Sequence, residues 1–478
     1  MATVHVSGAR PRRAMEIMLM LLATAIGISA YVLTNLNRTG TLPPSLGLHV
    51  GLFVAIAVVA ELIVQFTAPY ADPVILPISV TLTGLGLAMI HRLDLSYEKL
   101  GVATTGSRQL IFAFAGLALM ALILVFLRDH RVLRRFTYTS MVVSLILLIL
   151  PMLPGIGVEH YGARVWVRIA GFEFQPAEFV KITLAIFFAG YLVSNRDKLS
   201  IGGPKILGLR LPRLRDLGPI LVVWLIGIAV LVLQKDLGTS LLFFGLFVAM
   251  LYVATNRVSW LVIGALLFIP AAFVAVKVFP HVQNRFTVWL NALSPEVYEA
   301  QGGSYQLVQG LYGMATGGLL GTGWGRGYPQ VVPLADSDFI LSSFAEELGL
   351  VGVMAILMLY LVLVERGLRA ALGTRDGFGK LLAAGLSFSL ALQLFVVLGG
   401  ISRVIPMTGL TAPFLAKGGS SMLASWITIA LLLRISDAAR RPSPKAKTWE
   451  EASRVADAKT NATGVPLLKA SDFEGDAS

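Results

Sequence analysis

The sequence contains no cysteine among its 478 residues, and only 14% of its residues are charged. The lack of cysteine excludes disulfide bonds, thiolate zinc sites and a cysteine nucleophile. Six histidines are present, but no two have the spacing of paired metal ligands, which argues against a histidine-based transition-metal site. Charge is scarce compared with the roughly 25% of soluble domains, whereas 56% of the residues are hydrophobic. A soluble fold could not bury so much apolar surface, so the composition indicates an integral membrane protein.

The apolar residues gather in runs that cover, or nearly cover, the thickness of a bilayer as helices. Strands could cross a membrane only by closing into a barrel of alternating polarity. We therefore predict an all-α polytopic bundle of about 12 transmembrane helices. The predicted runs are Ile17–Leu33, Leu46–Phe66, Val74–Ile90, Leu110–Leu127, Tyr138–Leu153, Pro176–Val193, Leu217–Leu233, Ser240–Ala254, Trp260–Phe279, Phe339–Val364, Leu381–Val397 and Pro413–Ile435.

The basic residues indicate which helix ends face the cytoplasm. The net charge is +12, and most of the excess lies in the tails and in the short segments that follow even-numbered runs. Because cytoplasmic loops are enriched in Lys and Arg, this alternation predicts cytoplasmic N- and C-termini and two long outer loops, 154–175 and 280–338. It also explains the charge without a nucleic-acid partner. The predicted divisions are a basic N-terminus (1–16), a helix pair (17–70), a transmembrane core (74–435) and a disordered cytoplasmic tail (436–478).

Polar side chains at the edges of the runs are candidates for function, because charge in a bilayer is costly unless it is paired or faces water. Glu178 and Lys181, which follow Pro176, share one helix face. They form either a structural ion pair or the lining of a polar cavity. Asp236, two residues after Gln234, either ends a helical hairpin or belongs to the same cavity.

Carboxylates near the start of the tenth run form the strongest candidate. Asp338 closes the long outer loop, and Glu346 and Glu347 follow about two helical turns later. Two adjacent carboxylates in an apolar helix cannot both face lipid, so at least one needs a cavity or a partner such as Lys181. Pairing explains the two glutamates better than it explains Asp338, which favours a functional role for Asp338.

The residues before the last run suggest an interrupted helix. Pro406 and Pro413 precede a stretch that begins at Gly418 and includes Ser420. Irregular backbone at membrane depth is tolerated only where it is packed in protein or lines a cavity. Arg403 and Lys417 are predicted to supply positive charge there, which suits a pyrophosphate.

These motifs, in this order, resemble the RodA/FtsW (SEDS) family of bacterial membrane proteins. Further marks of the resemblance are Trp166 after Gly162-Ala163 and Gln309 before Gly317-Gly318-Leu319, and the match runs from about residue 75 to 436. Family members usually have about ten spans, so the first two runs look like an N-terminal addition of the kind found in actinobacterial members. Lys235 and Lys417 stand where the family commonly has proline and an aromatic residue.

The resemblance implies a ten-helix core preceded by two helices, and a peptidoglycan glycosyltransferase of the bacterial cytoplasmic membrane. Such an enzyme polymerises lipid II on the outer face, with inversion, into β-1,4-linked glycan, and its implied partner is a class B penicillin-binding protein transpeptidase. Asp338 is the implied catalytic base and a candidate ligand for Mg²⁺ or Mn²⁺. The implied substrate-binding or cavity residues are Glu178, Lys181, Asp236, Gln309, Arg403 and Ser420, and the implied supporting residues are Trp166, Gln234, Glu346, Glu347 and Lys417.

Two other functions fit parts of the sequence. Many spans, intramembrane charges and helices broken by Gly and Pro are also features of transporters, here a lipid II flippase. Against that reading, the strongest motifs cluster on the outer side instead of at the midplane. A non-catalytic scaffold for a transpeptidase is the second alternative, and it would tolerate loss of Asp338. The N-terminal addition and the short tail favour a role in elongation (RodA-like) over one in division (FtsW-like).

Overall fold

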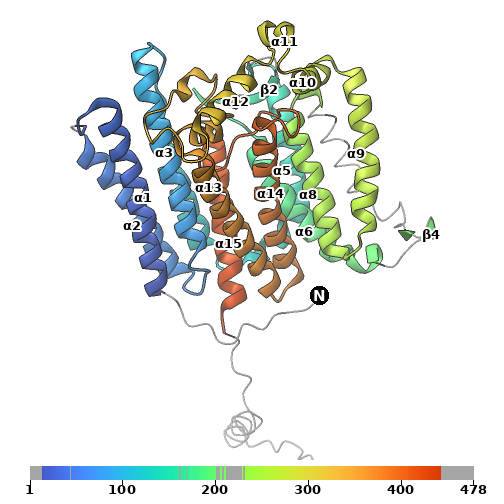
Figure 1. Cartoon of the computed structure of the whole chain (residues 1–478). Coiled ribbons are helices and arrows are strands. Elements are labelled where there is room, and N and C mark those ends of the chain that lie inside the picture. Colours follow the sequence, from blue (N-terminus) through green and yellow to red (C-terminus); the bar gives the residue numbers. More distant parts are fainter. Residues whose placement is uncertain are drawn as a thin grey trace, which may run out of the picture.

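The computed structural model describes residues 13–43, 45–160, 163–169, 171–200, 205–206, 209–210, 225, 229 and 232–442. Within these residues, 11 helical segments are long and apolar enough to cross a membrane, and they lie side by side in one bundle (Figure 1). This confirms the prediction of a polytopic, all-α membrane fold. The predicted run Leu217–Leu233 lies almost wholly outside the described residues. The segments are α1 (Arg13–Thr39), α2 (Leu46–Thr67), α3 (Ile75–Lys99), α4 (Gly106–Phe126), α5 (Thr137–Ile149) with its flanking 3-10 turns η1 (His130–Phe136) and η2 (Leu150–Met152), α6 (Ala177–Ser200), α8 (Leu237–Thr255), α9 (Ser259–Val278), α13 (Ile340–Gly373), α14 (Gly377–Ile401) and α15 (Gly419–Arg440).

Several helices extend beyond the apolar runs that predicted them. Helix α1 begins at Arg13, inside the predicted basic N-terminus, and α15 continues to Arg440, inside the predicted tail. Lys and Arg can end a membrane helix because their long side chains carry the charge to the interface. At its other end α15 begins at Gly419 and not at Pro413, so the last predicted run was too long there. Residues 443–478 lie outside the described part of the chain.

The two long loops that follow the fifth and ninth runs gather at one end of the bundle (Figure 1). The first folds into an antiparallel sheet of β1 (Gly157–His160), β2 (Ala163–Ile169) and β3 (Phe172–Phe174), in that order. The second contains α10 (Pro280–Leu290), α11 (Pro295–Glu299), α12 (Tyr305–Gly317) and the 3-10 turn η3 (Pro329–Val331). A short hairpin of β4 (Lys205–Ile206) and β5 (Leu209–Arg210) lies at the opposite end of the bundle (Figure 1). The sequence did not predict the sheet, since strands of three to seven residues give little signal beside long apolar runs.

Helix α13 is interrupted at Gly349, whose φ of 67° and ψ of −172° are not helical. The loop 318–323 enters this interruption, and the amide of Gly323 donates to the carbonyl of Glu347 at 3.0 Å. Such bonds replace part of the helical ladder that is lost at the kink. A Cβ on Gly321 would lie 2.2 Å from the same carbonyl oxygen, so only glycine allows this approach. The glycine-rich run after α12 therefore fixes the path of the chain toward Asp338.

The N-terminal pair α1 and α2 packs against α3. A Cβ on Gly27 of α1 would lie 3.3 Å from the Cα of Gly84 on α3 and 2.6 Å from a ring carbon of Phe53 on α2. Small residues let membrane helices approach closely where no hydrophobic effect drives them together. The three helices therefore meet around the ring of Phe53, which is buried.

Candidate active site

A cavity of about 430 Å³ lies at the end of the bundle that carries the long loops. Its walls come from the start of α4, strands β2 and β3, the residues before α8, helix α10, the residues before α13 and the segment 408–421. The cavity brings together five residues that the sequence singled out, from segments far apart in the chain. They are Trp166, Asp236, Asp338, Lys417 and Ser420.

Asp338 lies directly before α13, outside the membrane-spanning helix, and its side chain borders the cavity. The backbone of Gly409 approaches this side chain. A Cβ on Gly409, whose φ is 78°, would lie 3.7 Å from Oδ2 of Asp338. Burial raises the pKa of Asp338 to about 6, and the Arg285 guanidinium and a hydrogen bond from Ser337 limit the rise. A carboxylate with this pKa is ionised at neutral pH and still basic enough to accept a proton.

Arg285 of α10 also lines the cavity, although it was not among the predicted site residues. Its Nη1 donates to the carbonyl of Met407 at 2.8 Å, which holds the guanidinium at the wall. Its positive charge acts on both Asp236 and Asp338. No signal in the sequence separates Arg285 from the other polar residues of the long loop, because its role depends on how α10 folds back over the bundle.

Further cations border the same cavity. Arg108 of α4 and Lys235, which precedes α8, are among its lining residues together with Arg285 and Lys417. Lys235 has a φ of 63°, in the left-handed region that few residues other than glycine adopt. The cavity is therefore rich in positive charge, which surrounds the lining carboxylates Glu173, Asp236 and Asp338.

Asp236 is at once a helix cap and a lining residue. Its Oδ1 accepts a hydrogen bond from the amide of Thr239 at 3.0 Å, which caps α8. Burial raises its pKa, against the hydrogen bonds from Thr239 and the charge of Arg285. A Cβ on Gly238 would lie 2.8 Å from the Cβ of Thr408, so the first turn of α8 packs directly on the cavity segment 408–421. Gln234, by contrast, is buried and donates its amide to the carbonyl of Leu148.

Glu178 and Lys181 lie behind the cavity wall, which corrects the prediction that they line it. Lys181 Nζ donates to Glu178 Oε2 at 2.6 Å and to Gln393 Oε1 at 2.8 Å. Gln393 in turn donates to the carbonyl of Thr411 at 2.9 Å, and Thr411 borders the cavity. All three polar side chains are buried, so the pair stabilises the wall through Gln393.

Ser420 and Lys417 belong to the cavity segment 408–421 and connect it to neighbouring loops. Ser420 Oγ accepts a hydrogen bond from the amide of Gln175 at 2.7 Å, which joins the start of α15 to the residues before α6. Lys417 Nζ pairs with Asp336 Oδ2 at 2.7 Å, and its amide donates to the carbonyl of the same residue at 2.7 Å. Lys417 therefore anchors the loop that carries Asp338, while its side chain remains at the cavity surface.

Arg403 and Gln309 are not among the residues that line the cavity, contrary to prediction. Arg403 donates from Nε and Nη2 to the carbonyls of Trp289 and Leu290, each at 2.7 Å. Its guanidinium thus caps the end of α10 and does not face the site proposed for a phosphate. Gln309 donates to the hydroxyl of Tyr298 at 2.8 Å and joins α12 to α11.

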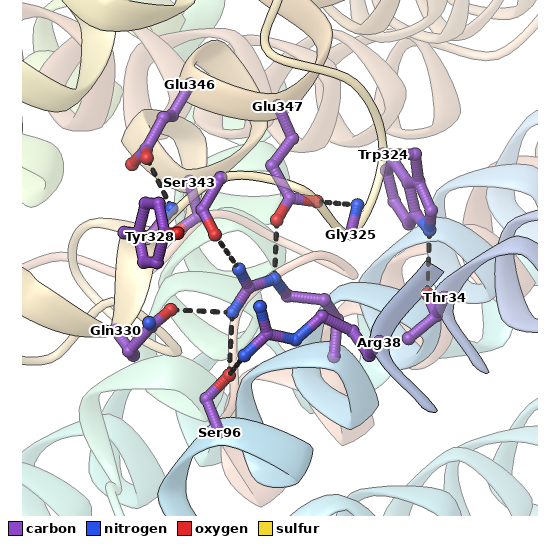
Figure 2. Close-up of polar contacts among 12 residues, drawn as sticks. Thr34, Arg38, Ser96, Trp324, Gly325, Tyr328, Gln330, Ser343, Glu346 and Glu347 are labelled. Carbon is purple, nitrogen blue, oxygen red and sulfur yellow. Dashed lines mark hydrogen bonds and ion pairs between the residues drawn. The ribbon is translucent and has the colours of Figure 1, made fainter. Parts of the chain in front are cut away.

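Glu346 and Glu347 fix the loop between α12 and α13 (Figure 2). The partner of Glu347 is Arg92 of α3, whose Nε lies 2.5 Å from Oε1, and not Lys181 as the sequence suggested. Both side chains of this pair are fully buried. Glu347 Oε2 also accepts from the amide of Gly325 at 2.8 Å, and Glu346 Oε1 accepts from the amide of Tyr328 at 2.6 Å. Arg92 was not among the predicted site residues because it follows the third run, where a loop cation would be unremarkable.

The residues of the cavity fit a divalent cation only in part. In the described ranges no group of three or more His, Asp or Glu side chains could hold a metal. Mg²⁺, however, is commonly held by one or two carboxylates together with substrate phosphates. Asp338, which borders a cavity open to a ligand, meets that requirement.

Comparisons with known proteins agree with the predicted family. The family profile FTSW_RODA_SPOVE, described as cell cycle protein, matches residues 73–441. Peptidoglycan glycosyltransferase RodA of Mycobacterium tuberculosis (strain ATCC 25618 / H37Rv) is 46% identical over 434 residues, which cover 90% of this chain and 92% of that protein. Stage V sporulation protein E of Bacillus subtilis (strain 168) is 30% identical over 370 residues, 76% of this chain and 96% of that protein. A solved structure, "Structural coordination of polymerization and crosslinking by a peptidoglycan synthase complex", superimposes with a TM-score of 0.53 at 26% identity, covering 82% of this chain and 98% of that chain.

Proposed function

The chain belongs to the FtsW/RodA/SpoVE family, and from this premise we propose that it polymerises lipid II into β-1,4-linked glycan strands during cell elongation. It is a peptidoglycan glycosyltransferase, like the relatives of that name that match nearly its whole length. The observation that carries the proposed mechanism is the position of Asp338. This carboxylate borders a cavity whose other walls supply Arg108, Lys235, Arg285 and Lys417.

The proposed reaction is an inverting displacement. The 4-hydroxyl of a GlcNAc unit attacks the anomeric carbon of MurNAc, and the bond from that carbon to the pyrophosphate oxygen breaks. The bonding electron pair leaves with undecaprenyl pyrophosphate, and the hydroxyl proton passes to a base. Pyrophosphate can leave without a proton, so the reaction needs one base and not the acid–base pair of a glycosidase. Of the three lining carboxylates, Asp236 caps α8 and Glu173 pairs with Arg168. Asp338 is therefore the candidate base, and the lining cations suit the leaving group.

We assign Asp338 as the base and the cavity cations as partners of the leaving pyrophosphate. The raised pKa of about 6 suits proton transfer near neutral pH. Arg285 is held by Met407 at the wall that Asp338 also borders, where its charge acts on the carboxylate and on a ligand. A Mg²⁺ or Mn²⁺ ion held by Asp338 and the substrate phosphates would add positive charge to the leaving group.

The proposed reaction also implies how the protein is oriented in the membrane and which protein it works with. The end of the bundle with α10, α11, α12 and the cavity faces outward, where lipid II is available after its transfer across the membrane. The N- and C-termini then lie in the cytoplasm of a bacterium, in agreement with the basic loops at the opposite helix ends. The matched structure is of a complex that joins polymerisation with crosslinking. We therefore propose a class B penicillin-binding protein as the transpeptidase partner.

The test measures glycan strands formed from purified lipid II by the purified chain in liposomes, with and without the partner and Mg²⁺ or Mn²⁺. Asp338→Asn should abolish polymer without lowering the thermal midpoint, since the amide keeps the shape of the carboxylate but cannot act as a base. Arg285→Ala should lower kcat by about 10²–10³, the usual effect of removing one group that stabilises charge in a transition state. Glu299→Gln, at an exposed carboxylate of α11, is the matched control and should keep wild-type activity.

Three results would contradict the proposal. Full polymerisation by Asp338→Asn would remove this residue from the chemistry. Transport of lipid II across the bilayer without polymer would instead support a flippase. Normal cell-wall synthesis in cells that carry only Asp338→Asn, provided that the variant still binds the transpeptidase, would support a scaffold.

A further inference from the structure

A second cavity, of about 380 Å³, lies between the N-terminal helix pair and the core. This interhelical cleft is lined by residues of α1, α2, α3 and α4. Its volume falls within the range of about 300–1,000 Å³ that is usual for small-molecule sites. Because its walls are four membrane-spanning helices, the molecules that can enter it sideways are those dissolved in the bilayer. Nothing in the reaction proposed above uses it.

The chemistry of the cleft suits an apolar chain. Ile28, Leu52, Leu87 and Leu110 line it, and the ring of Phe53 also borders it. Most of its polar side chains already have partners within the protein. Tyr31 OH lies 3.2 Å from Nδ1 of His49, and Nε2 of His91 lies 3.3 Å from Oδ1 of Asn35. No Lys or Arg occurs among the lining residues that the structure describes, so the cleft offers an anionic headgroup no counter-charge of its own.

The cleft and the Asp338 cavity share one wall, the first turns of α4. Gly106, Ser107 and Ile111 face the cleft, whereas Arg108 and Gln109 face the Asp338 cavity. The two spaces are therefore separated by the thickness of one helix, at the same end of the bundle.

Hydrogen bonds on both sides hold this wall in place. On the cleft side, Asp94 accepts from the amides of Thr105 and Gly106 at 3.0 and 2.6 Å. On the other side, Gln109 accepts from the amide of Gly418 at 3.1 Å. The start of α4 thus joins α3 to the cavity segment and keeps both spaces open at once. A ligand that reached around the start of α4 would contact apolar side chains in the cleft and cations such as Arg108 in the Asp338 cavity.

We propose that the interhelical cleft binds the polyprenyl chain of a lipid-linked pyrophosphate whose head group occupies the Asp338 cavity. The proposal rests on the proposed function, because it takes the pyrophosphate site from there. The chain of a bulk phospholipid is the less suitable occupant, since its phosphate would find no cation in the cleft. A pyrophosphate attached to the bound chain finds Arg108, which directly follows the cleft residue Ser107 on the first turn of α4. The N-terminal helices would then serve to complete the substrate site.

The first test compares tryptophan substitutions at the mouth of the cleft with matched substitutions away from it. Ile111→Trp on α4 and Leu48→Trp on α2 place a large ring at exposed lining residues. Leu122→Trp and Leu62→Trp are the controls, at exposed positions of the same two helices outside the cleft. We expect the lining variants to raise KM for full-length lipid II at least about tenfold, equivalent to about 1.4 kcal/mol, with little change in kcat.

A short-chain lipid II analogue sharpens this comparison, because its chain would not fill the cleft. The KM for the analogue should be similar in wild type and in all four variants. If Ile111→Trp and Leu48→Trp leave the KM for full-length lipid II unchanged while wild type polymerises it, the cleft proposal is wrong and the glycosyltransferase mechanism stands. Equal rises in KM with both substrates would also overturn it, since they would indicate a general distortion.

The second test does not depend on turnover. A benzophenone amino acid is placed at residue 111 or 48, with residues 122 and 62 as controls, in the full chain in phosphatidylglycerol liposomes with radiolabelled undecaprenyl pyrophosphate. Crosslinking of the label at 111 and 48 that exceeds that at 122 and 62 supports the proposal, even if the polymerisation assay fails. Equal labelling at all four positions, or loss of labelling when unlabelled phosphatidylglycerol is raised but not when unlabelled undecaprenyl pyrophosphate is added, overturns it.

Discussion

Removal of Glu347 should destabilise the protein more than removal of any exposed carboxylate on the same helix. Glu347 and Arg92 are fully buried, 2.5 Å apart, and Glu347 also accepts the amide of Gly325. Glu347→Ala therefore leaves a buried guanidinium without its counter-charge and a buried amide without its acceptor. Breaking a buried ion pair in this way costs about 3–5 kcal/mol.

The assay is thermal unfolding of the purified chain in detergent. One kcal/mol shifts the midpoint of chains of 150–250 residues by about 2–4 °C, and longer chains shift less. At about 1 °C per kcal/mol for a chain of this length, Glu347→Ala should lower the midpoint by about 3–5 °C. Glu365→Ala is the matched control on α13, because Glu365 is 39% exposed and pairs with the exposed Arg369. It should cost about 0–1 kcal/mol.

Replacement of both partners tests the reasoning directly. In Arg92→Met with Glu347→Met no buried charge is left unpaired, so the double variant should be more stable than Glu347→Ala. A midpoint for Glu347→Ala within about 1 °C of that for Glu365→Ala would refute the account of a buried, mutually dependent pair. So would a double variant that loses as much stability as the two single variants together.

Three further predictions concern other parts of the molecule. Activity should fall as the pH decreases through about 6, the pKa of Asp338, and a pH–rate profile with no such limb would contradict the assignment of the base. Because that pKa lies above the ordinary value of 3.8, the folded protein loses up to about 3 kcal/mol of stability as the pH rises from about 4 to about 6 and Asp338 ionises. Asp338→Asn removes this charge, so it should raise the thermal midpoint at pH 8 but not at pH 4. Equal midpoints for the variant and wild type at pH 8 would count against a buried charge. Gly349→Ala should lower the midpoint strongly, since a Cβ would lie 2.3 Å from the amide of Gly321 at a φ of 67°, whereas Gly51→Ala in open space on α2 should be neutral or stabilising by up to about 1 kcal/mol.

Local patterns in the chain were sufficient to identify most of the bundle. Eleven of the predicted runs correspond to helices in the described residues, because the length of an apolar run is set by bilayer thickness and not by neighbours in the fold. The sheet β1–β3 and helices α10 to α12 were not predicted. Their residues lie in polar loops, where short elements are decided by packing on the bundle.

Only some of the predicted site residues lie at the cavity. Asp236, Asp338 and Ser420 were placed at the cavity, as expected. Of the two alternatives for Glu178 and Lys181, the structure has the ion pair, so Lys181 is not the partner suggested as an example for Glu346 and Glu347. Spacing within a helix can identify an i,i+3 pair such as Glu178 with Lys181, but it cannot show which distant helix meets a carboxylate.

The sequence by itself determined the membrane class, the approximate spans and the candidate Asp338, because hydropathy, charge asymmetry and carboxylates at the edges of apolar runs are local properties. Only the tertiary structure decided that Arg285 faces Asp338, that Arg403 caps α10 and that Arg92 is the partner of Glu347. A cation becomes a ligand, a cap or a counter-ion according to which carbonyl or carboxylate the folded chain brings within hydrogen-bonding distance. These partners lie more than 50 residues away in the sequence, and no local pattern encodes them.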